Sequence, residues 1–158
     1  MEKKPISRMG YDNLLKELKD LQEVQRPEIL KTVQWARSLG DLSENADYSA
    51  ARERQRQIDN RIRFIESVIE NAAVIDIDSL TGNRVVFGAR VIAEDEDGNK
   101  MQCRILSDIE SDGRTVISCT SPVGRAMIGR CVGDTCVVRL PSGEKEFEIL
   151  SVSFGEEK

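Results

Sequence analysis

The chain has 158 residues, of which 32% are charged and only 4% aromatic, with a formal net charge of -5 and a pI near 5.0. This acidic balance excludes a protein that coats nucleic acid through bulk attraction. No apolar run approaches the roughly 20 residues that span a bilayer, and the N-terminal residues lack the apolar segment of a signal peptide. We therefore expect a cytoplasmic protein without membrane contact. The absence of histidine removes the usual general base and the usual catalytic triads.

Residues 7–39 are predicted to form a long helix, with Ser7 as its N-cap. Its apolar seam follows heptad spacing as far as Leu21 and then stretches to consecutive spacings of four around Pro27. Proline removes a backbone hydrogen bond and usually kinks a helix. We therefore expect this arm to be bent or locally unwound near Pro27, but not broken.

Residues 46–73 are predicted to form a second helix with a cleaner heptad seam. The seam positions alternate between spacings of four and three: Ala51, Gln55, Ile58, Ile62, Ile65, Ile69 and Ala72. Helices joined by so short a turn run antiparallel, so the two arms form a coiled-coil hairpin on the order of 45 Å long. Because the seam narrows to alanine near the turn, the arms can approach closely there.

The pattern changes to strands beyond the second helix. Short alternating runs bounded by turn residues predict strands at residues 84–94, 100–107, 115–120, 135–140 and 144–154. Residues 97–99 and 141–143 are typical of hairpin turns. A short helix at 121–129 is indicated by Ser121 at its N-cap, Pro122 at its first position and Gly129 past its end.

The predicted fold class is therefore α+β. A coiled-coil hairpin would occupy residues 1–76 with its tip at 40–46, followed by a linker at 77–82. A compact antiparallel sheet or half-barrel with a short helix would occupy residues 83–158.

The cysteines are interpreted as small, buried or half-buried thiols in strands. The four cysteines are Cys103, Cys119, Cys131 and Cys136, and no two of them have Cys-x-x-Cys spacing. Because the chain also has no histidine, neither a zinc site nor disulfides are expected.

The hairpin tip carries two carboxylates, Asp41 and Glu44, which admit two interpretations. An acidic N-cap followed three residues later by glutamate is the capping box of a helix. Alternatively, both carboxylates face outward and complete a divalent-metal site in the active site of another protein, since Mg²⁺ is usually held by one or two protein carboxylates plus phosphates. Leu42, apolar at an exposed turn, favours a tip that docks into a pocket. Arg52, two helical turns beyond the tip, could share the same target.

Two separated motifs resemble those of the bacterial Gre transcript-cleavage factors, in the right order and over nearly the whole chain. The first motif lies at the tip: Gly40, Asp41, Leu42, Glu44, Asn45, Ala46 and Tyr48, followed by Ala50, Ala51 and Arg52. The second lies in the C-terminal half: Ser121, Pro122, Arg125, Ala126, Ile128 and Gly129, then residues 132–134 and the pattern from Pro141 to Ile149. Within the family, the acidic balance is more similar to the branch whose coiled coil is less basic.

The resemblance implies that the coiled coil enters the secondary channel of bacterial RNA polymerase. Asp41 and Glu44 would help to hold a second Mg²⁺ there and orient the attacking water, and the polymerase would cut the backtracked RNA near its 3′ end. The factor itself would be no enzyme, would bind no cofactor tightly and would act as a monomer. The implied contacts with polymerase or the nascent RNA 3′ end are Arg37, Leu42, Tyr48 and Arg52.

The resemblance also implies an FKBP-like C-terminal domain that docks at the rim of the channel, near a coiled coil of the β′ subunit. The implied docking residues are Ser121, Pro122, Arg125, Ala126, Ile128 and Gly129. Each of them can equally belong to a capped helix that fills its own sheet.

Three other functions remain open. A Gre-like protein can occupy the channel without stimulating cleavage, although both tip carboxylates are present here. An FKBP-type peptidyl-prolyl isomerase needs an aromatic-lined pocket, and residues after 80 include only Phe87, Phe147 and Phe154. A purely structural coiled-coil adaptor would leave the acidic tip without a role.

Overall fold

The computed structural model describes residues 3–40 and 45–155. Contacts divide the chain into two compact units: Tyr11–Ala72 forms the first, and Lys3–Gly10 joins the chain from Ala73 onward in the second. This division differs from the predicted boundaries at 76 and 83. The reason is strand β1 (Lys4–Ser7), which the sequence analysis missed and which pairs with β2 (Ala72–Ile75). In the described part of the chain, no helix is long and apolar enough to cross a bilayer.

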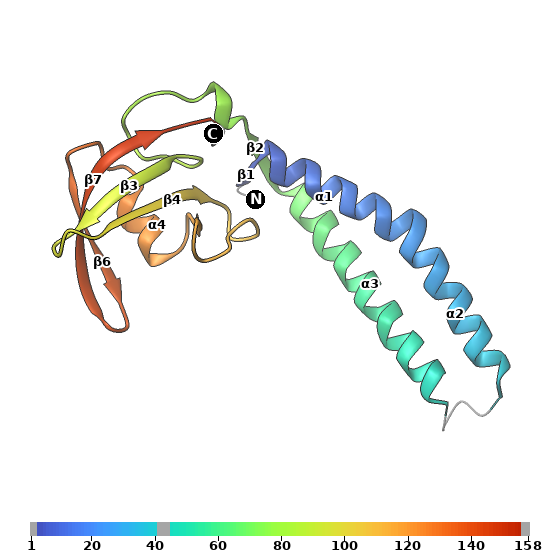
Figure 1. Cartoon of the computed structure of the whole chain (residues 1–158). Helices are drawn as coiled ribbons and strands as arrows, with labels where there is room; N and C mark the ends of the chain where they lie inside the picture. Colours follow the sequence, from blue (N-terminus) through green and yellow to red (C-terminus); the bar gives the residue numbers. More distant parts are fainter. Residues whose placement is uncertain (1–2, 41–44, 156–158) are drawn as a thin grey trace. The chain divides into compact units, whose positions relative to one another are not determined.

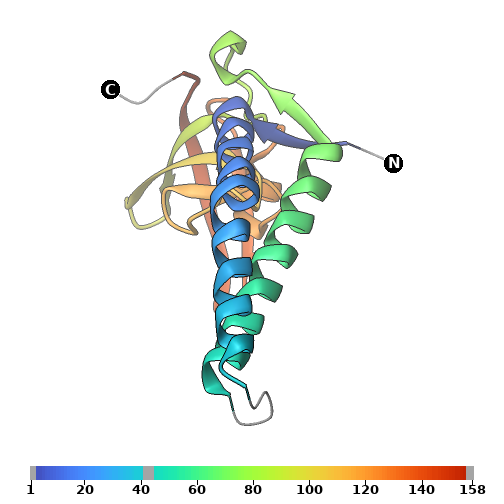
Figure 2. The ribbon, with the colours of Figure 1, turned by 90° about the vertical axis from the view of Figure 1, so that its right-hand side faces the viewer.

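The first unit is an antiparallel helical hairpin. Its arms lie side by side in both views of the chain (Figure 1 and Figure 2). The first arm runs through α1 (Arg8–Asp20), the π-helical turn η1 (Leu21–Gln25) and α2 (Arg26–Ser38), and the second arm is α3 (Ala46–Glu70). The predicted hairpin is confirmed, and so is Ser7 as the first N-cap, because its hydroxyl accepts the Gly10 N–H at 3.0 Å.

The π-helical turn lies immediately before Pro27. The Arg26 N–H donates to the Leu21 carbonyl, five residues back, and Pro27 then occupies the first turn of α2. Proline lacks an N–H and its ring clashes with the carbonyl four residues earlier, so a wider turn relieves both problems. The expected local unwinding without a break is confirmed.

An apolar seam holds the two arms together. The first arm contributes Leu14, Leu21, Val33 and Ala36, and the second contributes Ala51, Ile58, Ile62 and Ile65, all of them buried. Near the tip the seam consists of Ala36 and Ala51, and these small side chains allow the helices to approach closely, as predicted.

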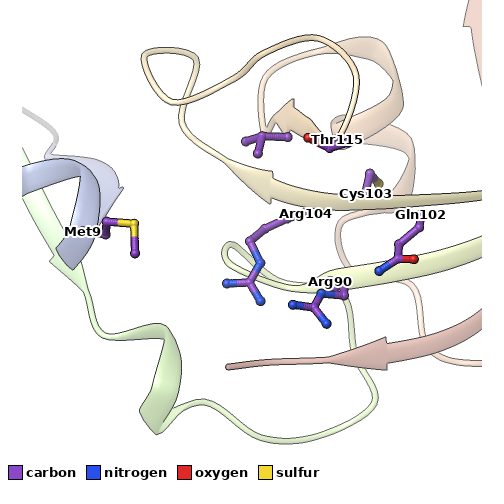
Figure 3. Close-up of a pocket in the computed structure, with 7 residues that line it drawn as sticks. Met9, Arg90, Gln102, Cys103, Arg104 and Thr115 are labelled. Atoms are coloured by element: carbon purple, nitrogen blue, oxygen red, sulfur yellow. The ribbon is translucent and has the colours of Figure 1, made fainter. Parts of the chain in front are cut away.

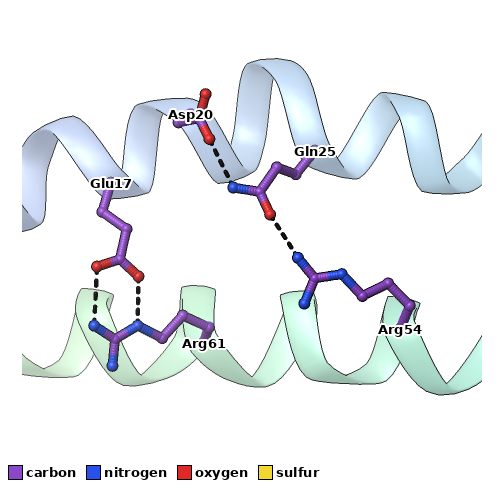
Figure 4. Close-up of polar contacts among 5 residues, drawn as sticks. All are labelled: Glu17, Asp20, Gln25, Arg54 and Arg61. Carbon is purple, nitrogen blue, oxygen red and sulfur yellow. Dashed lines mark hydrogen bonds and ion pairs between the residues drawn. The ribbon is translucent and has the colours of Figure 1, made fainter.

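Polar side chains bridge the arms beside the seam (Figure 4). Arg61 holds the Glu17 carboxylate through two hydrogen bonds, the one from Nη2 to Oε1 being 2.9 Å long, and this contact lowers the pKa of Glu17. Within the π-helical turn, the Gln25 amide donates to Asp20 at 2.6 Å and accepts from Arg54 at 2.9 Å. These contacts tie both halves of the first arm to α3.

The second unit contains a five-stranded sheet with the order β5-β4-β3-β7-β6. Its strands are β3 (Arg90–Asp95), β4 (Lys100–Leu106), β5 (Val116–Ser118), β6 (Thr135–Leu140) and β7 (Gly143–Ser153). They lie close to the predicted ranges except that β3 begins at Arg90, whereas the prediction began at residue 84. The pairing is antiparallel except between β4 and β5, which are parallel, so the expectation of a purely antiparallel sheet was wrong at this edge. The short 3₁₀ helix η2 (Ile77–Ser79) lies between β2 and β3.

The sheet has one core face and one outer face. Alternate strand residues such as Val91, Cys103 and Ile149 enter the core, where α4 (Pro122–Met127) adds the fully buried Met127. Because side chains alternate along a strand, Arg90 and Arg104 lie on the opposite face. The α+β class with a hairpin and a small β unit is confirmed.

The buried serines Ser7 and Ser107 share one carboxylate, that of Glu110. Glu110 accepts from the Ser107 hydroxyl at 2.7 Å, from the Ser7 hydroxyl, and from both backbone N–H groups at 3.3 Å. A Cβ at Gly10 would collide with this carboxylate, so glycine leaves room for it. The cluster fastens the N-terminal segment to the β unit.

Replacing Glu110 with alanine should lower the free energy of unfolding by roughly 2–4 kcal/mol, because two buried hydroxyls lose their acceptor. Urea unfolding followed by circular dichroism measures this loss. The control is Glu144→Ala on β7, where the carboxylate is exposed and the cost should stay within about 0.5 kcal/mol. Equal costs for the two variants would contradict a fastening role for Glu110.

Glu17→Gln should cost up to about 1 kcal/mol at neutral pH, the usual upper range for a half-exposed ion pair. The pKa of Glu17 is lowered by Arg61, so the stabilisation is present above the unfolded-state pKa and is lost as the pH falls through the lowered folded-state value. Urea unfolding of both proteins at pH 7 and about pH 3 should show the difference disappearing in acid. Glu53→Gln, whose partner Arg56 lies on the same helix, should change stability less. A pH-independent difference would contradict this account.

Candidate functional site

The first helix ends in a tight turn at the base of the tip. The Leu39 N–H donates to the Ala36 carbonyl at 3.2 Å, and the Gly40 N–H donates to the Arg37 carbonyl at 3.3 Å. Gly40 has a φ of 105°, which glycine adopts without strain. The chain therefore leaves α2 at Gly40, directly before the acidic motif.

Asn45 caps the second helix and also ties it to the first. Its side-chain oxygen accepts the Tyr48 N–H at 3.0 Å, and its side-chain nitrogen donates to the Ala36 carbonyl at 2.6 Å. One amide thus satisfies an orphan donor at the start of α3 and a carbonyl at the end of α2. The two helix ends are fixed to each other on both sides of the tip.

This arrangement rules out the capping-box interpretation of the acidic pair. The N-cap of α3 is Asn45 and its third helical residue is Tyr48, whereas a capping box would have placed Asp41 and Glu44 at these positions. Asp41, Leu42 and Glu44 lie outside the described residues. By their place in the sequence, both residues precede the N-cap Asn45.

The predicted contact residues Arg37 and Tyr48 are brought together from opposite arms. The guanidinium carbon of Arg37 lies 5.8 Å from the centre of the Tyr48 ring, within the range of a cation–π contact. Arg52 follows Tyr48 by four residues on the same face of α3 and donates to Gln55 at 2.5 Å. Two arginines and a tyrosine are therefore positioned at the base of the tip.

Two exposed apolar side chains near the tip received no functional role in the sequence analysis. Trp35 is 55% exposed and Leu39 is 54% exposed, and they lie four residues apart on one face of α2. Both residues are apolar although they lie outside the seam, and this position in the heptad pattern could have marked them as exposed apolar residues. Asn45 was also missed as the cap, because the acidic pair fits a capping box by spacing alone.

The predicted docking residues around α4 divide into structural and exposed groups. The Ser121 hydroxyl caps α4 by accepting the Gly124 N–H at 3.1 Å, and Ala126 packs against the sheet core. Gly129 has a φ of 91° and donates to the Val85 carbonyl at 2.8 Å. The side chains of the remaining three are exposed: Pro122, Arg125 and Ile128.

The cysteines are free thiols, as expected. Cys103 and Cys136 are buried in strands β4 and β6, and burial raises the pKa of Cys103 to about 11. Cys119 and Cys131 are half-buried outside the named strands, so the prediction of a strand position was wrong for these two. A thiol with a raised pKa is a poor nucleophile at neutral pH, so Cys103 acts as a packing residue.

Comparison with known proteins covers both units. Residues 4–74 match the family model described as "Transcription elongation factor, N-terminal", and residues 80–154 match the one described as "Transcription elongation factor, GreA/GreB, C-term".

Curated relatives are similar over their full length. A transcription elongation factor GreA from Anaeromyxobacter sp. (strain K) is 49% identical, with 100% of this chain and 96% of the relative covered. A GreA from Helicobacter pylori (strain ATCC 700392 / 26695) is 42% identical, with 99% and 96% covered. Among solved structures, GreA factor homolog 1 (Gfh1) of Thermus thermophilus is 25% identical, with a TM-score of 0.45 and 97% and 99% of the two chains covered. On the two family matches and the two GreA relatives, the chain belongs to the GreA/GreB family of transcription elongation factors.

Proposed function

We propose that this elongation factor inserts its hairpin into the secondary channel of bacterial RNA polymerase and stimulates the polymerase's own cleavage of backtracked RNA. The observation that carries this proposal is the cap of α3 by Asn45, because the N-cap position that spacing alone suggested for Asp41 belongs to Asn45. Family membership supports the role in elongation. The factor supplies side chains, while the polymerase supplies the catalytic centre.

Asp41 and Glu44 would share a Mg²⁺ with the acidic residues of the polymerase. Two carboxylates are too few for a self-sufficient Mg²⁺ site, but they suit an ion that is also held by phosphate oxygens and by a partner. When bound, that ion would lower the pKa of a water and so favour attack on the phosphodiester. The role of Asp41 and Glu44 is to hold the ion and to accept a hydrogen bond from the water.

The base of the tip would bind the extruded RNA. Arg37 and Arg52 can contact phosphate oxygens through their guanidinium groups, and Tyr48 keeps Arg37 in place through the cation–π contact. Phosphate contacts do not read the base sequence, which suits a factor that acts at any arrest site.

A second contact would be made by the exposed side chains around α4. Pro122, Arg125 and Ile128 would dock at the rim of the channel near the β′ coiled coil, with Ser121, Ala126 and Gly129 supporting their positions from within the fold. This contact would bind the factor without taking part in cleavage.

The isosteric variants Asp41→Asn and Glu44→Gln should each slow Mg²⁺-dependent RNA cleavage in a stalled, backtracked elongation complex by about 100-fold or more, equivalent to about 2.7 kcal/mol. Each variant loses a charged ligand for Mg²⁺ but keeps its size. Cleavage is followed as 3′ shortening of labelled RNA at saturating factor.

The matched control is Asp47→Asn, an exposed carboxylate in the first turn of α3, which should cleave within about threefold of the wild type. A wild-type protein that binds polymerase without stimulating cleavage would be a channel-occupying regulator, the alternative function. Full activity in both tip variants would overturn the mechanism.

Trp35 offers a direct measure of insertion, because it is the only tryptophan of the chain and it is exposed near the tip. With 5-fluorotryptophan at this position, its ¹⁹F resonance should shift and broaden when core polymerase is added, and an excess of unlabelled factor should reverse the change. Trp35→Ala should weaken binding by roughly tenfold, as for a buried aromatic contact in an interface. Val24→Ala, exposed on the same arm farther from the tip, should have little effect. An unchanged resonance in a saturated complex would contradict insertion of this end.

A further inference from the structure

The outer face of the β sheet carries two arginines directly opposite each other. Arg90 on β3 pairs with Arg104 on β4, and Arg90 also pairs with Ser153 on β7. Residues opposite each other in an antiparallel pair have Cβ atoms about 5 Å apart, and like charges at such positions repel. Within the described residues, no ion pair involves Arg90. An overall acidic chain thus keeps two adjacent cations on one face.

These arginines line a pocket of about 540 Å³ within the second unit (Figure 3). Figure 3 shows both guanidinium groups extending from neighbouring strands into the same space, with Gln102 beside them and Met9 across from them. The volume falls in the range of about 300–1,000 Å³ that is typical of small-molecule sites. Val116 adds a second apolar side chain to the lining.

Hydrogen bonds in the surrounding loops fix Arg104 and occupy the nearby carboxylate of Asp112. Arg104 donates to the Gly155 carbonyl, which fixes its guanidinium. Asp112, next to the lining residue Thr115, accepts three backbone N–H bonds and the Thr115 hydroxyl at 2.6 Å, and these contacts hold the pKa of Asp112 well below its usual range. The Asp112 carboxylate is therefore committed to its own loop.

We propose that this pocket binds a phosphate-bearing ligand of nucleotide size, with Arg90 and Arg104 as its phosphate site. Two guanidinium forks about one strand apart can bracket a single multiply charged anion and donate to several of its oxygens. Gln102 supplies a further donor, while Met9 and Val116 offer apolar contact to an organic body. The site lies in the β unit and does not depend on the proposed action of the hairpin tip.

The test is isothermal titration of the full chain with pyrophosphate and with ATP, without Mg²⁺ and at low salt. Both probes should bind, ATP more tightly than pyrophosphate because of the apolar contacts. Arg90→Gln should weaken the affinity for both probes by at least tenfold. The affinity of Arg90→Lys should lie between those of the wild type and Arg90→Gln, since lysine keeps the charge but loses the paired N–H donors of the guanidinium. Backbone amide shifts in ¹⁵N-labelled protein should cluster on β3 and β4.

The matched control is Arg139→Gln, an exposed arginine on β6 that faces Glu144, which should bind within twofold of the wild type. Thermal unfolding of each variant confirms that the fold is kept. Equal losses in Arg90→Gln and Arg139→Gln would reduce the effect to bulk attraction and overturn the site. Absence of binding at millimolar concentrations of either probe would also overturn the site. A hexaglutamate peptide that binds as tightly as ATP and is lost in Arg90→Gln would replace the phosphate ligand with an acidic protein segment.

Discussion

The packing of two helical arms along one apolar seam is the constraint on which the first unit depends. Eight buried side chains, ending in Ala36 and Ala51, keep the antiparallel arms side by side to within a few residues of the tip. Because an isolated helix of this length gains little stability from propensity alone, the seam and not the individual helices makes the arms rigid. Arg37 and Tyr48 can meet across the arms only because the alanines allow this close approach. The geometry at the functional end therefore follows from small residues in the core.

In the second unit, the alternation of side chains along each strand gives the sheet one apolar face and one polar face. One face of the sheet provides the core, closed by α4 and Met127, while the other face is free to carry polar side chains. Glu110 adds a local device, since a single carboxylate satisfies two buried serines and fastens β1 beside β2. The charged side chains thus differ in their surroundings: Glu110 is half-buried and accepts hydrogen bonds from both serines, Asp112 accepts hydrogen bonds from its own loop, and Arg90 has no ion pair within the described residues.

The sequence predicted most of the fold because its signals are periodic and local. Heptad spacing identified both arms, Pro27 marked the irregular turn, and Ser121, Pro122 and Gly129 bounded the short helix correctly. Pairing between distant segments left no such signal: β1 is four residues long, and the parallel partner of β4 cannot be distinguished by alternation. At the tip, spacing suggested Asp41 as a cap, whereas the N-cap is Asn45, directly before the helix begins at Ala46. The second bond of Asn45, to Ala36, exists only once the arms are packed. The placement of Arg90 opposite Arg104 likewise could not be predicted, because it depends on the register between β3 and β4.

The π-helical turn has a consequence for the direction in which the side chains of α2 face. Each seam interval of four residues overshoots a full α-helical turn by about 40°, so the three consecutive intervals from Leu21 to Val33 would rotate the seam by about 120° away from α3. A π turn takes about one residue more than an α turn and absorbs roughly 100° of this drift. Forcing all residues of Leu21–Gln25 into α-helical geometry would therefore turn the far half of the arm by roughly 100°, whereas removing one of these residues would let the turn close as an α turn and keep that half facing α3. Trp35 and Arg37 therefore owe the direction in which they face to an irregularity several helical turns away.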